Sequence, residues 1–161
     1  MLEKIKPYFK TYAIAIAIPL TVGIIAAALT RESMDIYGML NKPPLSPPAI
    51  LFPIVWTVLY VLMGVSSGLV YSNRENNEKA AKNGLKYYAI SLAFNFLWSI
   101  IFFRLNSLLL AFICLLVLLY FIIRTVIEYN KVFPIAAYLQ IPYIAWVSFA
   151  GYLNLALVFL N

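Results

Sequence analysis

The chain has 161 residues, of which 64% are hydrophobic and 11% are charged. Soluble domains carry about a quarter charged residues, so this composition excludes a soluble domain and is typical of an integral membrane protein. The formal charge of +6 could indicate nucleic acid as a partner, but the basic residues stand at the ends of apolar runs, as topology signals and contacts for anionic lipid do. We therefore expect the lipid bilayer, and no nucleic acid, as the partner of this chain.

The residue types that are missing or rare limit the chemistry further. The chain contains no histidine, and its single cysteine, Cys114, lies in an apolar run. The sequence thus predicts no metal site, no cofactor and no intrachain disulfide, and a buried, inert thiol. All six acidic residues fall in loops or at helix ends, so proton relays, ion coupling and acid–base catalysis within the bilayer lack their residues.

Five apolar segments are long enough to cross a hydrocarbon core of about 30 Å, and we expect one all-α domain that forms a five-helix transmembrane bundle. The predicted helices span residues 8–30, 49–72, 85–103, 107–128 and 134–159. A cleavable signal peptide is the alternative for the first segment, but its apolar run exceeds the roughly 7–15 residues of such signals. Pro19 and Gly23 are expected to bend the first helix, and Pro142 to kink the fifth.

Residues 31–48 form the long loop of the predicted bundle. Four residues in it are expected to matter most: Lys42, Pro43, Pro47 and Pro48. Proline fixes φ and donates no backbone hydrogen bond, so the segment from Lys42 to Pro48 should be stiff, extended and non-helical. We expect the loop to form a lid over the mouth of the bundle.

The basic residues also predict an orientation, because five spans place the two ends of the chain on opposite sides of the membrane. Nine basic residues lie at the N-terminal side of the bundle: Lys4, Lys6, Lys10, Arg74, Lys79, Lys82, Lys86, Arg124 and Lys131. Three lie on the other side: Arg31, Lys42 and Arg104. The positive-inside rule then predicts a cytoplasmic N-terminus, with the long loop and the C-terminus on the opposite side.

Aromatic and amide side chains remain at mid-depth. The residues that share helix faces are Trp56 and Tyr60 on the second helix, Asn95, Trp98 and Phe102 on the third, and Tyr143, Trp146 and Ala150 on the fifth. A helix–helix hydrogen bond would account for Asn95, and packing would account for each tryptophan singly. Together they indicate an aromatic-lined cavity for a flat apolar ligand. The spacing of Gly64 and Gly68 fits the close-packing motif of membrane helices, for which homodimerisation and internal packing both remain open.

The segment KPPLSPPAILFPIVWTVLYVLMG, residues 42–64, resembles the signature of the translocator protein family, also called the tryptophan-rich sensory protein or peripheral benzodiazepine receptor family. The matching positions are Lys42, Pro43, Pro47, Pro48, Val55, Trp56, Leu59, Tyr60, Met63 and Gly64. The third helix is similar through Asn95, Trp98, Phe102 and Phe103, and the fifth through Pro142, Tyr143, Ala145, Trp146, Phe149, Leu153 and Asn154. At two positions where the family carries tryptophan, this chain has Leu45 and Ile50.

This resemblance implies a five-helix bundle, often dimeric, whose cavity beneath the first loop binds porphyrins and synthetic benzodiazepine-site ligands. It implies that Asn95, Trp98, Cys114 and Ala150 line or border that pocket. Trp56 and Trp146 match the tryptophans linked in bacterial relatives to light-dependent breakdown of protoporphyrin.

We therefore predict a membrane-embedded binding or sensor protein for tetrapyrroles, such as porphyrin and haem, and other flat apolar ligands. One alternative is a light-dependent porphyrin-degrading enzyme with Trp56 and Trp146 as its catalytic residues. Another is a transporter of porphyrins or sterols, although no internal repeat of the kind that transporters show is visible. Sterol binding carries over poorly, since the family's animal members have a basic residue near the C-terminus and this chain has none after Lys131.

Overall fold

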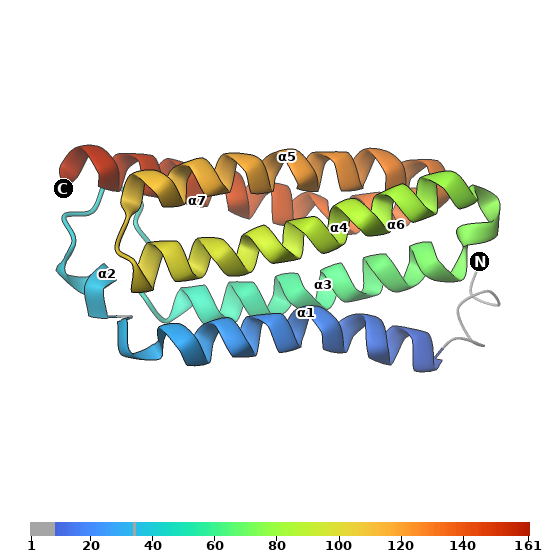
Figure 1. The fold of residues 1–161 in the computed structure, drawn as a ribbon, viewed down its shortest axis with the longest axis horizontal. Helices are drawn as coiled ribbons and strands as arrows, with labels where there is room; N and C mark the ends of the chain where they lie inside the picture. The colour runs from blue at the N-terminus through green and yellow to red at the C-terminus, as the bar shows by residue number, and fades with distance from the viewer. Residues whose placement is uncertain (1–8, 34) are drawn as a thin grey trace.

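A computed structural model describes residues 9–33 and 35–161, and within them the chain forms a helical bundle without strands (Figure 1). Five helical spans in this part of the chain are long and apolar enough to cross a membrane, which confirms the predicted fold class. They are α1 (Phe9–Thr30), α3 (Leu51–Ser72), α4 (Glu78–Ser99), α5 (Leu108–Val132), and α6 (Pro134–Leu139) together with α7 (Ile141–Leu160). Lys4 and Lys6, which were counted for the orientation, lie outside the described residues.

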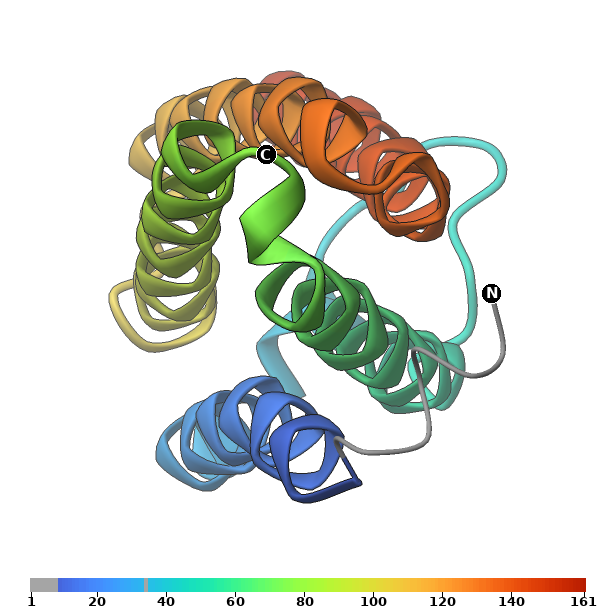
Figure 2. The same ribbon diagram turned by 90° about the vertical axis from the view of Figure 1, so that its right-hand side faces the viewer.

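The helices associate unevenly around the bundle (Figure 2). α4 packs along α5, α5 packs along α7, and α1 packs along α3. By contrast, α1 meets α4 only sparsely, and α3 joins the fifth span chiefly through the short helix α6. The bundle therefore consists of a pair, α1 with α3, set against a layer formed by α4, α5 and α7.

The two glycines of the close-packing motif face α1 within the same chain. A Cβ atom at Gly64 would overlap the backbone of Ile16, and one at Gly68 would overlap the ring of Tyr12. α1 runs without a break through Pro19, which is buried. Proline donates no hydrogen bond, so the carbonyl of Ala15 has no helical partner, and this carbonyl also faces Gly64. The motif is thus used for internal packing.

Two predicted helix boundaries differ from those in the structure by four residues or more: the start of α4, and the end of α5, which lies at Val132 rather than at residue 128. α4 begins at Glu78 rather than at residue 85, because the side chain of Asn77 caps it by accepting a hydrogen bond of 3.1 Å from the amide of Ala80. α4 then passes into a π-helical turn, η5 (Ile100–Arg104). The chain reverses direction at Asn106, whose φ is 50°.

The fifth span is interrupted at Gln140, between α6 and α7. Pro142 has no amide hydrogen, so the helix cannot continue its regular hydrogen bonding across this point. The interruption is tied to α3 by side chains: Gln140 Nε2 donates to Ser66 Oγ at 3.1 Å, and Ser66 Oγ donates to the carbonyl of Ala136 at 2.7 Å. Pro142 thus divides the span into two helices.

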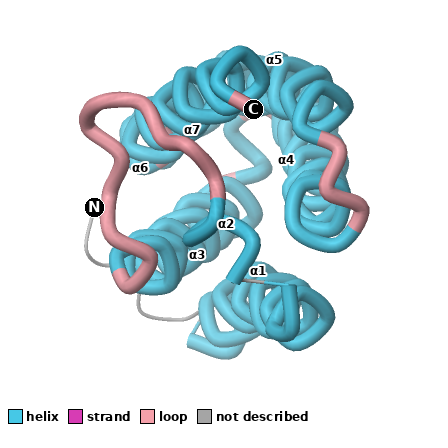
Figure 3. The backbone as a smooth tube through the Cα atoms, turned by 90° about the vertical axis from the view of Figure 1, so that its left-hand side faces the viewer, coloured by secondary structure: helices cyan, strands magenta, loops and turns pink. Residues whose placement is uncertain are grey.

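The long loop crosses one end of the bundle (Figure 3). Its first part is helical, with a 3₁₀ turn η3 (Arg31–Ser33) and the short helix α2 (Asp35–Met39), where the sequence predicted only a loop. The segment from Lys42 to Pro48 contains no helix and turns at Pro44 and Leu45, where Leu45 has a φ of 69°.

Three groups of hydrogen bonds hold the loop to the bundle or to itself. Tyr152 Oη donates to the carbonyl of Pro44, and Tyr37 Oη to that of Pro47, both at 3.1 Å. The side chain of Asn161 pairs with the backbone of Asn41 in both directions, each bond measuring 3.0 Å. The loop is therefore fastened to the last helix.

Candidate ligand-binding site

Aromatic side chains from three helices meet around Trp56, below the loop. The ring of Trp56 stacks on Tyr60, with centroids 5.6 Å apart. Trp98 of α4 lies 6.3 Å from Trp56, and Tyr143 and Trp146 of α7 lie 6.2 and 6.5 Å from it. The structure thus brings together all three tryptophans that the helical faces singled out.

The loop joins this aromatic cluster through Phe52, a contact that the sequence pattern did not signal. Tyr37 of α2 meets Phe52 edge to face at 5.2 Å, and Phe52 meets Trp146 in the same manner at 5.8 Å. Burial raises the pKa of the Tyr37 phenol above its ordinary value, so the group remains a neutral donor to the Pro47 carbonyl near neutral pH. The loop therefore adds the ring of Tyr37 to the outside of the cluster, against Phe52.

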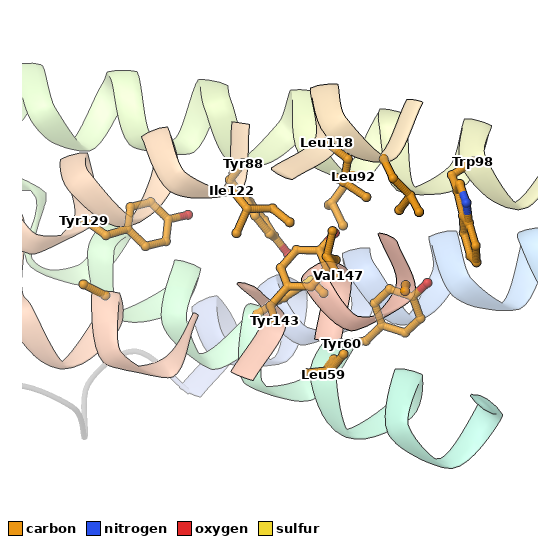
Figure 4. Packing of buried hydrophobic residues seen from close by; sticks show 14 of the residues in the cluster. Leu59, Tyr60, Tyr88, Leu92, Trp98, Leu118, Ile122, Tyr129, Tyr143 and Val147 are labelled. Atoms are coloured by element: carbon orange, nitrogen blue, oxygen red, sulfur yellow. The ribbon is translucent and has the colours of Figure 1, made fainter. Parts of the chain in front are cut away.

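Asn95 is 1% exposed, and its amide is engaged by tyrosines of two neighbouring helices. Its Nδ2 donates to Tyr143 Oη at 2.9 Å, whereas Tyr60 Oη lies 3.5 Å from its Oδ1, which is a weak hydrogen bond. Figure 4 shows Tyr143, Tyr60 and Trp98 following one another along the interior of the bundle. Asn95 thus cross-links α3, α4 and α7, as the helix–helix interpretation of this amide requires.

Trp98 is fixed in a similar way by a second buried amide. Its indole Nε1 donates to Asn154 Oδ1 at 3.1 Å, and Asn154 Nδ2 donates to the carbonyl of Leu108 at 2.8 Å. The π-helical turn η5 places Phe102 and Phe103 against the same indole, at 5.4 and 6.2 Å. The orientation of Trp98 is therefore determined by α5, α7 and η5 together.

A cavity of about 220 Å³ adjoins the cluster between α1, α3 and α4. The aromatic part of its wall comprises Phe52, Trp56, Tyr60, Trp98 and Phe103, and the remaining residues are Leu20, Gly23, Ile24, Ala26, Ala27, Thr30, Pro53, Thr57 and Ser99. A smaller space of about 20 Å³, which Phe102 and Ala150 help to line, lies beneath Tyr37. Neither reaches the roughly 300–1,000 Å³ of ordinary small-molecule pockets.

The indole nitrogen of Trp146 is a buried donor with no partner among the described residues. The Trp146 side chain also borders a groove between α3 and α7, which is lined only by apolar and aromatic side chains. An unpaired buried donor is costly, so an acceptor that reaches it would gain a hydrogen bond. In this respect Trp146 differs from Trp98, whose donor is occupied.

Known proteins are similar to this chain over most of its length. A profile of the TspO/MBR family matches residues 15–160. The chain belongs to the TspO/MBR family. It is 36% identical over 153 residues to the tryptophan-rich protein TspO of Chlorobaculum tepidum, which covers 94% of this chain and 96% of that protein. The tryptophan-rich sensory protein of Cereibacter sphaeroides is 33% identical over 153 residues, which are 95% of this chain and 90% of that protein. The translocator protein of Bos taurus is 35% identical over 133 residues, which are 82% of this chain and 79% of that protein.

The family resemblance was therefore assigned correctly, and the two departures from its signature have a structural counterpart. Leu45 and Ile50 are 82% and 69% exposed, and neither contributes to the aromatic cluster or to the cavity beside it. The lid of this TspO/MBR protein supplies Tyr37 to the cluster instead, through Phe52.

Of the residues predicted to bind the ligand, Trp56, Tyr60 and Trp98 line the cavity of about 220 Å³, whereas Asn95, Phe102, Cys114, Tyr143, Trp146 and Ala150 do not. Cys114 is buried on α5, with its Sγ 3.5 Å from the carbonyl of Phe94. In the lid, Lys42 Nζ lies 5.0 Å above the ring of Tyr37, and Pro43 is buried while Pro48 is exposed. Within residues 9–33 and 35–161, no three histidine, cysteine, aspartate or glutamate side chains gather in a way that could hold a metal ion.

Proposed function

We propose that this TspO/MBR protein binds tetrapyrroles, such as protoporphyrin and haem, and other flat apolar rings against the tryptophan cluster, and that it acts as a sensor of these molecules in the membrane. The observation that carries the proposal is the meeting of Trp56, Trp98 and Trp146 beside an apolar cavity beneath the loop. Flat rings gain stacking energy on such side chains in addition to that from area burial.

Binding of a macrocycle requires the cavity to widen, since 220 Å³ is too small for it. α1 supplies the wall that can move: Gly23, Ala26 and Ala27 line the cavity, and no hydrogen bond among the described residues joins α1 to another helix. The indole N–H of Trp146 is the donor left for a polar group on the ring. Because the chain contains no histidine, iron ligation should contribute little, and metal-free protoporphyrin should bind about as tightly as haem.

The test is a titration of protoporphyrin into detergent-purified protein, followed by tryptophan fluorescence. We expect quenching in the native protein and about tenfold weaker binding in Trp56→Phe/Trp146→Phe, which retains Trp98 at the cavity as its only tryptophan reporter. Phe159→Leu, at an exposed position on α7, serves as the control and should bind normally. Absence of quenching, or an unchanged affinity in the double variant, would contradict the proposal.

A second candidate function is light-dependent degradation of the bound ring, with dioxygen as the oxidant. It is favoured by the 6.5 Å separation of Trp56 and Trp146, which places two oxidisable indoles beside the ring-binding cluster. Under illumination, the porphyrin absorption band should then disappear faster with the native protein than with Trp56→Phe/Trp146→Phe. Equal bleaching by both proteins would mean ordinary photochemistry.

We also propose that the lid lies outside the cytoplasm. The distribution of basic residues supports this orientation, because more of them lie at the end of the bundle opposite the lid than at the lid end. The residues opposite the lid are Lys10, Arg74, Lys79, Lys82, Lys86, Arg124 and Lys131, and those at the lid end are Arg31, Lys42 and Arg104. In a Cys114→Ser background, Lys42→Cys should react with an impermeant maleimide on intact cells and Lys79→Cys should not. The reverse labelling pattern would invert the orientation.

A further inference from the structure

A second cavity, of about 460 Å³, lies at the end of the bundle opposite the lid. Its walls come from the first half of α1, the end of α3 and the middle of α4, and consist of Thr11, Ile14, Ala15, Ile18, Ser67, Tyr71, Leu85, Tyr88, Ala89 and Leu92. Its volume falls within the range of about 300–1,000 Å³ that small-molecule sites occupy. It shares no lining residue with the cavity at the tryptophans, so the two are separate sites.

One unpaired polar group lines this cavity. The hydroxyl of Tyr88, a residue only 6% exposed, is buried and has no hydrogen-bond partner among the described residues. Ser67, which also lines the cavity, already pairs with Tyr129 at 2.9 Å. Figure 4 shows Tyr88 and Leu92 pointing toward the interior from α4, and Tyr129 nearer the end of the bundle. A buried hydroxyl without a partner is destabilising, so an acceptor supplied by a ligand would complete this site.

Basic side chains lie at the same end of the bundle as this cavity. The Arg74 guanidinium lies 4.3 Å from the ring centroid of Tyr71, a lining residue. Lys82 continues the face of α4 that carries Leu85, Ala89 and Leu92, and its side chain is exposed. Lys10, Lys79 and Lys86 are exposed at the same end, where Glu75 and Glu78 are the exposed carboxylates. This end of the bundle therefore carries a net positive charge beside a largely apolar cavity.

We infer that this cavity binds one acyl chain of an anionic phospholipid from the leaflet at the N-terminal end of the bundle. The phosphate pairs with Arg74 and Lys82, because basic residues next to a membrane span attract anionic headgroups. The chain lies against Ile14, Ile18 and Leu92.

The hydroxyl of Tyr88 donates to the ester carbonyl of this lipid. Charged residues on α4 reach as far as Lys86, so Tyr88 lies just below the headgroup level, where the ester groups of a phospholipid are. This inference stands independently of ring binding at the tryptophan cluster, since no residue is common to the two sites.

To test this inference, the purified full-length protein is mixed with equal amounts of dioleoyl phosphatidylglycerol and dioleoyl phosphatidylcholine. The lipids that remain bound are then counted by native mass spectrometry. We expect selective retention of phosphatidylglycerol. Ala15→Phe, which fills the cavity, should abolish this retention, whereas Ala17→Phe, at an exposed position on the opposite face of α1, should preserve it. Equal retention of the two lipids by the native protein, or full retention of phosphatidylglycerol by Ala15→Phe, would overturn the inference.

Two further variants separate the roles of the headgroup and the hydroxyl. Arg74→Gln/Lys82→Gln should weaken phosphatidylglycerol binding about thirtyfold, since each basic group near an anionic surface contributes about 1 kcal/mol, and Arg124→Gln/Lys131→Gln on α5 should change it less than twofold. Tyr88→Phe, which removes only the donor, should weaken it about fivefold. The assignment of the ligand is wrong if both Tyr88→Phe and Arg74→Gln/Lys82→Gln bind phosphatidylglycerol with unchanged affinity. It is also wrong if equimolar oleate displaces the phospholipid.

Discussion

The two sides of α4 are held by different means. On the side of α5, Phe94 stacks on Phe121 at 5.9 Å, and the Arg124 guanidinium donates to Tyr87 Oη at 3.3 Å. On the side of α1 there are instead two cavities, and no hydrogen bond of the described residues connects α1 to another helix. One side of α4 is therefore packed and cross-linked, whereas the other has open space along much of its length.

This difference indicates which part of the bundle can change to admit a ligand. The buried amides Asn95 and Asn154 connect α3, α4, α5 and α7 through hydrogen bonds whose loss would leave polar groups unpaired in hydrocarbon. α1 is bound to α3 by close packing, which has no such penalty when a neighbouring space widens. Variants can test each half of this comparison.

The largest effect is expected at the contact that holds α1. Gly64→Leu should lower the free energy of unfolding by about 3 kcal/mol, because the new side chain overlaps the backbone of Ile16. Gly151→Leu, at a helical glycine with open space around it, should have little effect. Thermal unfolding in detergent measures both. Similar transition temperatures for the two variants would mean that α1 does not depend on this contact.

An intermediate effect is expected on the cross-linked side. Asn154→Leu removes the acceptor of the Trp98 indole and should cost about 2 kcal/mol of unfolding free energy, together with a change in tryptophan emission. Asn130→Leu, at an exposed position on α5, is the matched control. If the two variants unfold alike, the buried amide contributes nothing beyond filling its space.

The smallest effect on stability is expected at the fastening of the loop. Asn161→Ala removes both hydrogen bonds between its side chain and the Asn41 backbone and should cost less than about 1 kcal/mol, since these groups are exposed to solvent. Hydrogen exchange at the Asn41 amide should nevertheless become about fivefold faster, because that amide loses its acceptor. An unchanged exchange rate would show that the loop is held by its other contacts.

Much of the architecture follows from local sequence. Uncharged runs longer than the hydrocarbon thickness located the spans, and the spacing of four between Trp56 and Tyr60 placed both rings on one face, where they stack. The need of an amide for a partner in hydrocarbon predicted that Asn95 faces protein. The same reasoning applies to Asn154, which lies in an equally apolar run and belongs to the family motif of the fifth helix.

Features that depend on the relative rotation of helices could not be predicted in this way. No periodicity indicates that Tyr37 reaches the cluster through Phe52, or that Gly64 serves α1 rather than a second copy of the chain. The conformation of Leu45 was also hidden, because a left-handed φ is rare for leucine and is imposed here by the fastened loop. The small residues of α1 form a cavity wall only because α4 stands away from them.

The lack of hydrogen bonds between α1 and its neighbours has a consequence for the surrounding bilayer. Lipid tails are as apolar as the helices, so no hydrophobic force presses α1 against α3, and only the fit of their surfaces opposes tilting. A mismatch between a helix and the thickness of its membrane costs a fraction of a kcal/mol per ångström and is relieved by tilt. If rings bind beside α1 as proposed, their affinity should vary with acyl-chain length in reconstituted bilayers, and membrane thickness would then regulate ring binding.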